Sequence, residues 1–179
     1  MIRAAVLVAA LGCGVLAACG SSRDGSTTTG PTSPGGIVRP EGFDSAGIVI
    51  RRADGSACTL CTYLARNSAE WQRGLMAVTD LDGRDGMLFQ FPTPNTDRFW
   101  MRNTVLPLTG VWFGADGAFI DAIDMTPCPD AEPNCPLYGP GRPATTVLEL
   151  PLGTLQGLRI GEGSRLESVG VTCNGQANN

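Results

Sequence analysis

Short runs of β-branched, aromatic and alternating apolar residues, each ended by turn-forming residues, follow one another through most of this chain. Runs of this kind predict short strands. Many short strands with regular turns and little helix predict a mainly β fold, either a single β-sandwich or a barrel-like domain. The expected strands are Ala46–Arg52, Ala57–Ala65, Gly86–Phe91, Asp97–Arg102, Leu106–Gly114, Gly117–Met125, Thr145–Leu150 and Ser164–Thr172.

The turns and helices are indicated by a few residues. Asp116 and Gly117 lie between two strand-like runs, and an Asp-Gly pair supplies the backbone angles of a tight hairpin. Asn67 or Ser68 can cap a helix that runs to about Met76. A second short helix is expected over Leu152–Leu158. The domain therefore has one or two short helices.

The composition excludes several kinds of chemistry. The sequence has no His, and all 13 of its basic residues are Arg. A Ser-His-Asp triad, a Cys-His pair, a His-ligated zinc ion and a lysine Schiff base all need side chains that are missing here. The net charge of −4 and the scattered Arg residues argue against a nucleic-acid partner. We expect no metal ion and no cofactor.

The N-terminal residues are typical of an export signal. A short basic start and an apolar run from Ala4 to Leu16 precede Cys19. The residues Leu16 to Cys19 (LAAC) resemble a bacterial lipobox, so we expect a signal peptide over residues 1–18 and lipidation of Cys19. Cleavage of an ordinary signal peptide near Ala17 is the alternative. In the lipoprotein interpretation the membrane is a partner through the lipid anchor, and the domain faces the periplasm or the outside.

Residues 19–36 are rich in Gly, Ser, Thr and Pro and have almost no apolar side chains. Such a segment cannot bury enough surface to fold, so we expect a flexible tether. Residues 37–179 then form a single domain. A membrane-tethered domain of about 140 residues is large enough for one hydrophobic core.

Five cysteines follow the tether, and an exported chain meets an oxidising compartment. Cys128 and Cys135 flank a short proline-rich loop and are the firmest expected disulfide. Cys58 and Cys61 have the spacing of a redox motif, but both lie in an expected strand and not at a helix start. We therefore expect one of the two to bond Cys173 and the other to stay a buried free thiol. Cys61 is preferred as the partner of Cys173, with Cys58 as the alternative, and a thiol redox role is the least favoured interpretation.

Three runs carry a family resemblance: Arg73–Met76 (RGLM), Gly86–Phe89 (GMLF) and Phe99–Thr104 (FWMRNT), the last followed by Pro107 and Leu108. Together they resemble the domain of unknown function 192, from about Thr62 to Leu166. The resemblance implies a small all-β domain with no assigned reaction. Two positions depart from the expected family pattern: Arg102 stands where we expect Lys, and Thr109 where an acidic residue often follows Pro-Leu. A catalytic acid or base at Thr109 cannot be carried over.

The run from Phe99 to Thr104 is the main candidate for a ligand site. Aromatic residues followed by polar ones can form an apolar floor with a few convergent hydrogen-bonding groups. The same pattern also fits the end of a strand, where polar side chains satisfy a turn. Arg73 could bind a ligand or pair with Asp80, Asp82 or Asp85. The ligand-binding candidates are Arg73, Trp100, Arg102, Asn103, Thr104 and Trp112.

These features favour an envelope-anchored binding or accessory module for a small molecule, a glycan or a protein partner. The alternative is a carboxylate-based hydrolase, because acid–base chemistry needs only two suitably placed Asp or Glu. The acidic residues available for it are Asp85, Asp116, Asp121, Asp124 and Glu149, and their spacing singles out no pair.

Overall fold

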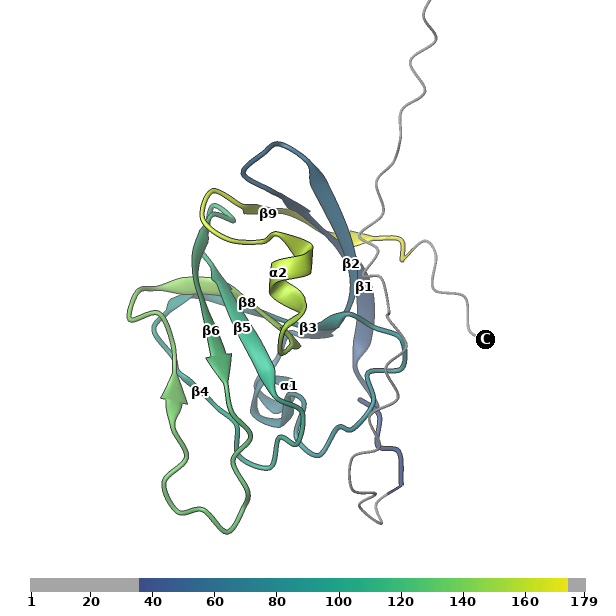
Figure 1. The fold of residues 1–179 in the computed structure, drawn as a ribbon, viewed down its shortest axis with the longest axis vertical. Helices are drawn as coiled ribbons and strands as arrows, with labels where there is room; N and C mark the ends of the chain where they lie inside the picture. Colours follow the sequence, from purple (N-terminus) through teal and green to yellow (C-terminus); the bar gives the residue numbers. More distant parts are fainter. Residues whose placement is uncertain (1–35, 174–179) are drawn as a thin grey trace, which may run out of the picture.

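A computed structural model describes residues 36–173 of the chain as a mainly β domain with two short helices (Figure 1). The mainly β prediction is confirmed. The strands are β1 (Asp44–Arg51), β2 (Ala57–Ala65), β3 (Gly86–Asn95), β4 (Phe99–Trp100), β5 (Leu108–Phe113), β6 (Phe119–Met125), β7 (Leu137–Tyr138), β8 (Ala144–Pro151) and β9 (Arg165–Val171). The helices are α1 (Ser68–Arg73) and α2 (Thr154–Leu158).

Seven of these strands form one sheet in the order β6-β5-β8-β3-β2-β1-β9. Neighbouring strands are antiparallel except β2 and β3, which are parallel and are connected through α1. A single bridge between Ala118 and Arg165 joins the two edges of the sheet at one corner. The sheet is not closed into a barrel, and the other sheet of residues 36–173 is the β4–β7 pair.

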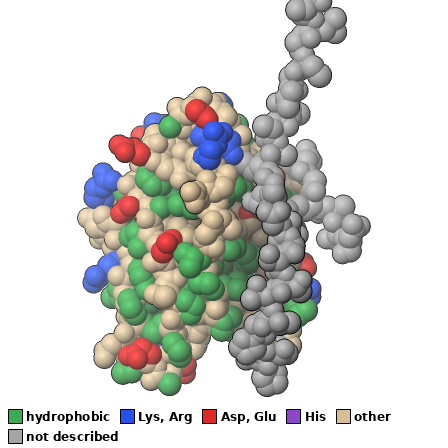
Figure 2. Space-filling model, viewed as in Figure 1, with side chains coloured by type: hydrophobic (Ala, Val, Ile, Leu, Met, Phe, Trp, Pro, Cys, Tyr) green, Lys and Arg blue, Asp and Glu red, His purple; other side chains and the backbone are tan. Residues whose placement is uncertain are grey.

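The central strands bury side chains on both faces of the sheet. Val147 belongs to one core cluster and Leu148 to another, and the same alternation occurs at Met87 and Leu88 of β3. Successive side chains of a strand point to opposite faces, so the two clusters lie on opposite sides of the sheet. Leu158 at the end of α2 belongs to the second cluster, and Figure 2 shows apolar side chains gathered over much of the face that carries α2.

The first helix is shorter than predicted. The Asn67 side chain accepts a hydrogen bond from the Glu70 backbone N–H, which caps the start of α1. The helix ends at Arg73 because Gly74 adopts a positive φ of 45° that interrupts the helical backbone. The predicted end at Met76 is therefore wrong. The second predicted helix, over Leu152–Leu158, corresponds to α2.

The predicted strand Asp97–Arg102 shortens to the two residues of β4. Phe99 and Trp100 pair with Tyr138 and Leu137 of β7, a strand that was not among those expected from the sequence. The predicted hairpin between β5 and β6 is confirmed, since the Gly114 N–H donates to the Ala118 carbonyl.

Both disulfide pairs expected from the sequence lie at bonding distance. Cys61 joins Cys173 across 112 positions of sequence, and Cys128 joins Cys135 across 7. The expectation that Cys58 stays a free thiol is wrong, because this buried residue is also disulfide-bonded. Within residues 36–173, no helix has the length and apolar character needed to cross a membrane. The expected signal peptide, Cys19 and nearly all of the tether lie outside the described residues.

Candidate functional site

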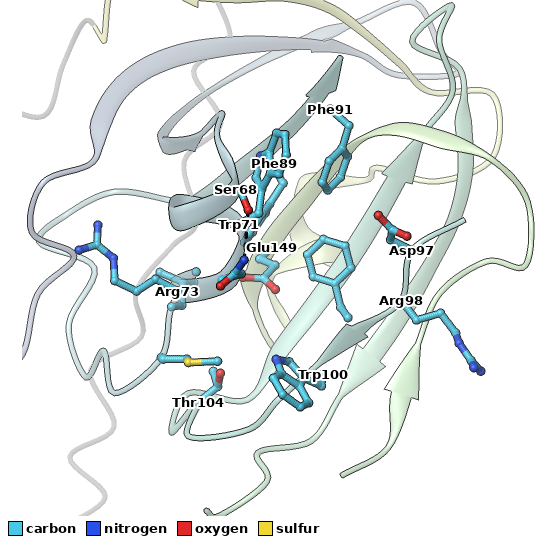
Figure 3. Close-up of a pocket in the computed structure, with 15 residues that line it drawn as sticks. Ser68, Trp71, Arg73, Phe89, Phe91, Asp97, Arg98, Trp100, Thr104 and Glu149 are labelled. Carbon is cyan, nitrogen blue, oxygen red and sulfur yellow. Dashed lines mark hydrogen bonds between the residues drawn. The ribbon is translucent and has the colours of Figure 1, made fainter. Parts of the chain in front are cut away.

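A cavity of about 300 Å³ opens between α1, β3 and β4 (Figure 3). Aromatic rings make up much of its lining, and a few polar side chains converge on it. Its size and composition are those of a small-molecule site. The cavity is lined by Ser68, Trp71, Gln72, Arg73, Gly74, Leu75, Met76, Phe89, Phe91, Asp97, Arg98, Phe99, Trp100, Thr104 and Glu149.

The aromatic walls are held by contacts with one another. The ring centroids of Trp71 and Phe91 are 5.1 Å apart, and those of Phe89 and Phe99 are 5.0 Å apart in an edge-to-face arrangement. Phe99 also meets Phe91 edge to face at 6.4 Å. The Trp71 indole N–H donates to the Ala65 carbonyl at 3.0 Å, which fixes this ring on the end of β2. The rings are therefore positioned before any ligand enters.

Glu149 lies on β8 at the inner side of the cavity, and its side chain is only 5% exposed. Its neighbours Leu148 and Leu150 point to the opposite face of the sheet, so the carboxyl group lies on the aromatic side. No hydrogen bond or ion pair from another described residue reaches this carboxyl group. Burial raises the pKa of Glu149 to about 8, so the group is mainly neutral at pH 7.

The arginine side chains at the cavity mouth point away from Glu149 (Figure 3). The Arg73 guanidinium lies 4.1 Å from the centre of the Phe43 ring, and no ion pair within residues 36–173 involves it. The proposed partners of Arg73 are engaged elsewhere, because Asp80 and Asp82 pair with Arg39. Figure 3 shows Glu149 at the centre of the labelled residues, while the guanidinium groups of Arg73 and Arg98 point outward on opposite sides.

The structure brings together three of the six predicted ligand-binding residues. Arg73, Trp100 and Thr104 line the cavity. Trp112 does not line it: its ring is buried in the core, 6.0 Å from the Phe99 ring, and its indole N–H lacks a partner among the described residues. The prediction of Trp112 as a ligand-binding residue does not match this position, because β5 is buried on both faces.

Arg102 lies outside the cavity lining and braces the loop that the Cys128–Cys135 bond closes. Its guanidinium donates to the carbonyls of Asp130 at 3.1 Å and Pro133 at 3.4 Å. The same guanidinium lies 5.3 Å from the centre of the Trp100 ring, which lines the cavity. Arg102 therefore supports Trp100 from behind and need not touch a ligand.

Asn103 also has a structural role. Its φ of 56° is in the left-handed region that Asn tolerates better than most residues. Its backbone N–H donates to the Cys128 carbonyl, and its own carbonyl accepts from the Ala77 N–H. Asn103 thus joins the end of β4 to two neighbouring loops.

Four of the five carboxylates considered for catalysis have other tasks. Asp85 accepts from the Cys61 N–H at 2.7 Å, Asp116 accepts from the Ala118 N–H, and Asp124 accepts from the Thr109 hydroxyl at 2.7 Å. Asp121 accepts from the Ala122 N–H. Only Glu149 of these five lines the cavity, where Asp97 joins it. Within residues 36–173, no three Cys, Asp or Glu side chains gather as a metal site.

Sequence reasoning missed much of the site. Trp71, Phe91 and Asp97 were not singled out, and Glu149 was named only as one of several acidic residues. One signal for Glu149 was present: it is the only charged residue in the apolar run from Val147 to Leu150. A charge within a strand that is buried on both faces is costly, so such a residue points to a cavity or to a special role.

Comparisons with known proteins place the chain in a family. The family model DUF192 (Uncharacterized ACR, COG1430) matches residues 49–168. The fold resembles a crystal structure from Sinorhizobium meliloti 1021, described as a proposed transcription regulator, with a TM-score of 0.62 and 29% identity over 74% of this chain and 97% of that one. No curated protein matches.

A second solved structure, of a protein of unknown function from Novosphingobium aromaticivorans DSM 12444, has a TM-score of 0.62 and 27% identity. The match covers 81% of this chain and 100% of that chain. Both similarities extend over nearly the whole of the related proteins, so they concern complete domains. Because the family model matches more than half of the sequence, this chain belongs to the DUF192 family.

Proposed function

We propose that the protein is an envelope-anchored lipoprotein whose β domain binds a small ligand in the aromatic cavity. The observation that carries this proposal is the cavity of about 300 Å³ with a buried, unpartnered carboxyl group among aromatic rings. Burying an ionisable group without a partner opposes folding, so natural cores rarely contain one without a function. A ligand that contacts Glu149 would give this group the partner it lacks.

The exposed ring of Trp100 gives a direct test of binding. This side chain is 48% exposed at the cavity lining, and its strand partner Leu137 is 50% exposed but lies outside the lining. Replacing either residue by Ala removes a large apolar group from the same short β-ladder. We expect Trp100→Ala to weaken ligand binding about tenfold or more and Leu137→Ala to leave it nearly unchanged.

The experiment is a screen of chemically diverse small molecules by thermal shift on the purified full-length protein. A compound that binds only the folded state raises the melting temperature. Hits should lose their effect in Trp100→Ala and keep it in Leu137→Ala. A set of hits that behaves the same in both variants, or the absence of any hit, would contradict binding in this cavity.

The anchoring part of the proposal depends on Cys19. The run of small residues before it and the polar tether after it support lipidation. Cells grown with a labelled fatty acid should label the wild-type chain and leave Cys19→Ser unlabelled. Label that persists in Cys19→Ser would contradict the lipoprotein assignment.

The regulatory role named for the Sinorhizobium relative is not part of this proposal. A DNA-binding surface needs several basic groups on one face. This chain has a net charge of −4, and many of its Arg residues pair with Asp or Glu, as Arg39, Arg51 and Arg165 do.

A hydrolase remains the second candidate, because Asp97 and Glu149 line the same cavity. A mainly neutral Glu149 could donate a proton while the exposed Asp97 acts as a base or nucleophile. Chromogenic glycoside and ester substrates would reveal such an activity. Hydrolysis that disappears in both Glu149→Gln and Asp97→Asn would favour the enzyme over the binding module.

A further inference from the structure

The charge inside the cavity indicates which ligands it accepts. Four lining residues are charged or ionisable: Arg73, Asp97, Arg98 and Glu149. The two guanidinium groups point outward in Figure 3, and Arg73 already lies on the Phe43 ring. The strand partners of Glu149 are Met87 and Gly110, which carry no charge. Among the described residues, the interior therefore contains an acidic group and no basic one.

The aromatic walls of the cavity also attract a cation, as the acidic Glu149 does. Trp71, Phe89, Phe91, Phe99 and Trp100 line the cavity. The face of an aromatic ring carries partial negative charge, so it attracts a cation, and the attraction is stronger where water is excluded. Rings around an acidic group form the kind of site that holds alkylated ammonium ions.

We infer that the ligand is a small organic cation with an alkylated ammonium group, which lies against the aromatic rings and pairs with the Glu149 carboxylate. This inference rests on the proposed function. A cavity of about 300 Å³ accommodates a compact cation such as choline and is too small for a polymer. When the cation enters below pH 8, the Glu149 carboxylic acid gives its proton to the solvent, so one cation is taken up and one proton is released.

A neutral ligand such as a sugar would use the site differently. It would accept a hydrogen bond from the protonated Glu149 and would bind best when that proton is present. The two ligand classes thus predict opposite responses to pH. For the cation, affinity rises with pH up to about 8 and then levels off; for the neutral ligand, affinity falls above that pH.

The experiment compares choline with its uncharged isostere 3,3-dimethylbutan-1-ol, in which carbon replaces the ammonium nitrogen. Isothermal titration of the full-length protein should give at least about tenfold tighter binding for choline at pH 9. Choline affinity should fall about tenfold for each pH unit below 8, since the proton then competes with the cation. At pH 7, titrations in buffers with different ionisation heats should show release of about one proton, and at pH 9 almost none.

Two variants complete the test. Glu149→Gln keeps the size of the side chain and removes its charge, so it should reduce the preference for choline to the part that the aromatic rings supply and should remove its pH dependence. Glu162→Gln, on an exposed turn outside the cavity lining, is the matched control and should bind like the wild type. If Glu149→Gln does not fold, the pH profile and proton release of the wild type still decide the matter.

The possible failures are distinguishable. Equal binding of both probes, or binding of neither at their solubility limits, would overturn the cation inference. The proposed function would survive that result if other compounds bind and lose their effect in Trp100→Ala. If no compound is sensitive to Trp100→Ala, the proposed function itself fails.

Discussion

The Trp112 indole lies directly over Gly110, so that a Cβ atom at Gly110 would stand 2.5 Å from Cη2 of the ring. Gly110 is the β5 residue that pairs with Glu149, and the buried ring cannot move aside without disturbing the core beneath the cavity. We expect Gly110→Ala to lower the free energy of unfolding by about 1 to 3 kcal/mol. Urea unfolding of the purified protein measures this loss.

Gly157 provides the matched control for that substitution. It lies in α2, and a Cβ atom there would meet no other atom within 4 Å. Gly157→Ala should therefore leave stability unchanged or raise it by about 0.5 to 1 kcal/mol, because Ala favours the helix. Equal effects of the two Gly→Ala substitutions on stability would show that the Trp112 ring does not prevent a larger residue at position 110.

Glu149 should make stability fall as pH rises. The unfolded chain loses this proton near the ordinary value of 4.5, whereas burial keeps the pKa in the folded protein at about 8. Between these values the folded state holds a proton that the unfolded state has released, so the free energy of unfolding decreases and then levels above pH 8. At about 1.4 kcal/mol for each pH unit, the largest loss is about 5 kcal/mol.

Urea unfolding at a series of pH values measures this dependence. Glu149→Gln should remove most of the decline between pH 5 and 8 and should be more stable than the wild type at about pH 9. Glu162→Gln should follow the wild-type profile. A wild-type stability that stays flat across this window would contradict a buried, unpartnered carboxyl group.

The Cys61–Cys173 and Cys128–Cys135 disulfides should contribute unequally to stability. In the chain-entropy model, a bond stabilises more when it closes a longer loop. Removing the Cys61–Cys173 bond, which spans 112 positions, should cost about 4 to 5 kcal/mol, and removing the Cys128–Cys135 bond, which spans 7, about 2 to 3 kcal/mol. Double Cys→Ala variants, unfolded in urea, give both values. If the Cys128–Cys135 bond stabilised the protein more, loop length would not be the main source of the stabilisation.

Arg102 should affect binding without contacting the ligand. Its guanidinium holds two carbonyls of the loop that includes Asp130 and Pro133, and it supports the Trp100 ring. Arg102→Ala should weaken the binding of a screening hit several-fold, with a stability loss of about 1 kcal/mol. Arg102→Lys keeps the charge but not the forked geometry, so it should restore only part of the affinity. Full restoration by Lys would indicate a role of charge alone.

Much of the fold could be predicted from local patterns. The strands that became β2, β3 and β8 are apolar runs between turn residues, and their bounds agree with the structure within a few residues at most ends. The exact end of α1 was harder to predict, because Leu75 and Met76 continue a helical pattern that the positive φ of Gly74 interrupts. The β4–β7 ladder is non-local, so neither short strand stands out in its own segment.

The candidate site was only partly predictable for the same reason. Trp100 and Thr104 belong to one recognisable run, but Glu149 reaches the cavity because β8 enters the sheet between β3 and β5. That arrangement cannot be read from the residues around Glu149. Trp112 looked like a binding residue because of its type, and only the burial of β5 on both faces shows that it packs in the core.

The position of β8 also has a consequence for the order in which the chain can fold. Although β8 is the eighth of the nine strands in sequence, it lies inside the sheet, between β5 and β3. A chain that grows from its N-terminus cannot join β5 to β3 until Ala144–Pro151 has left the ribosome. The β5–β6 pair therefore stays separate from β3, β2 and β1 until nearly all of the chain has been made.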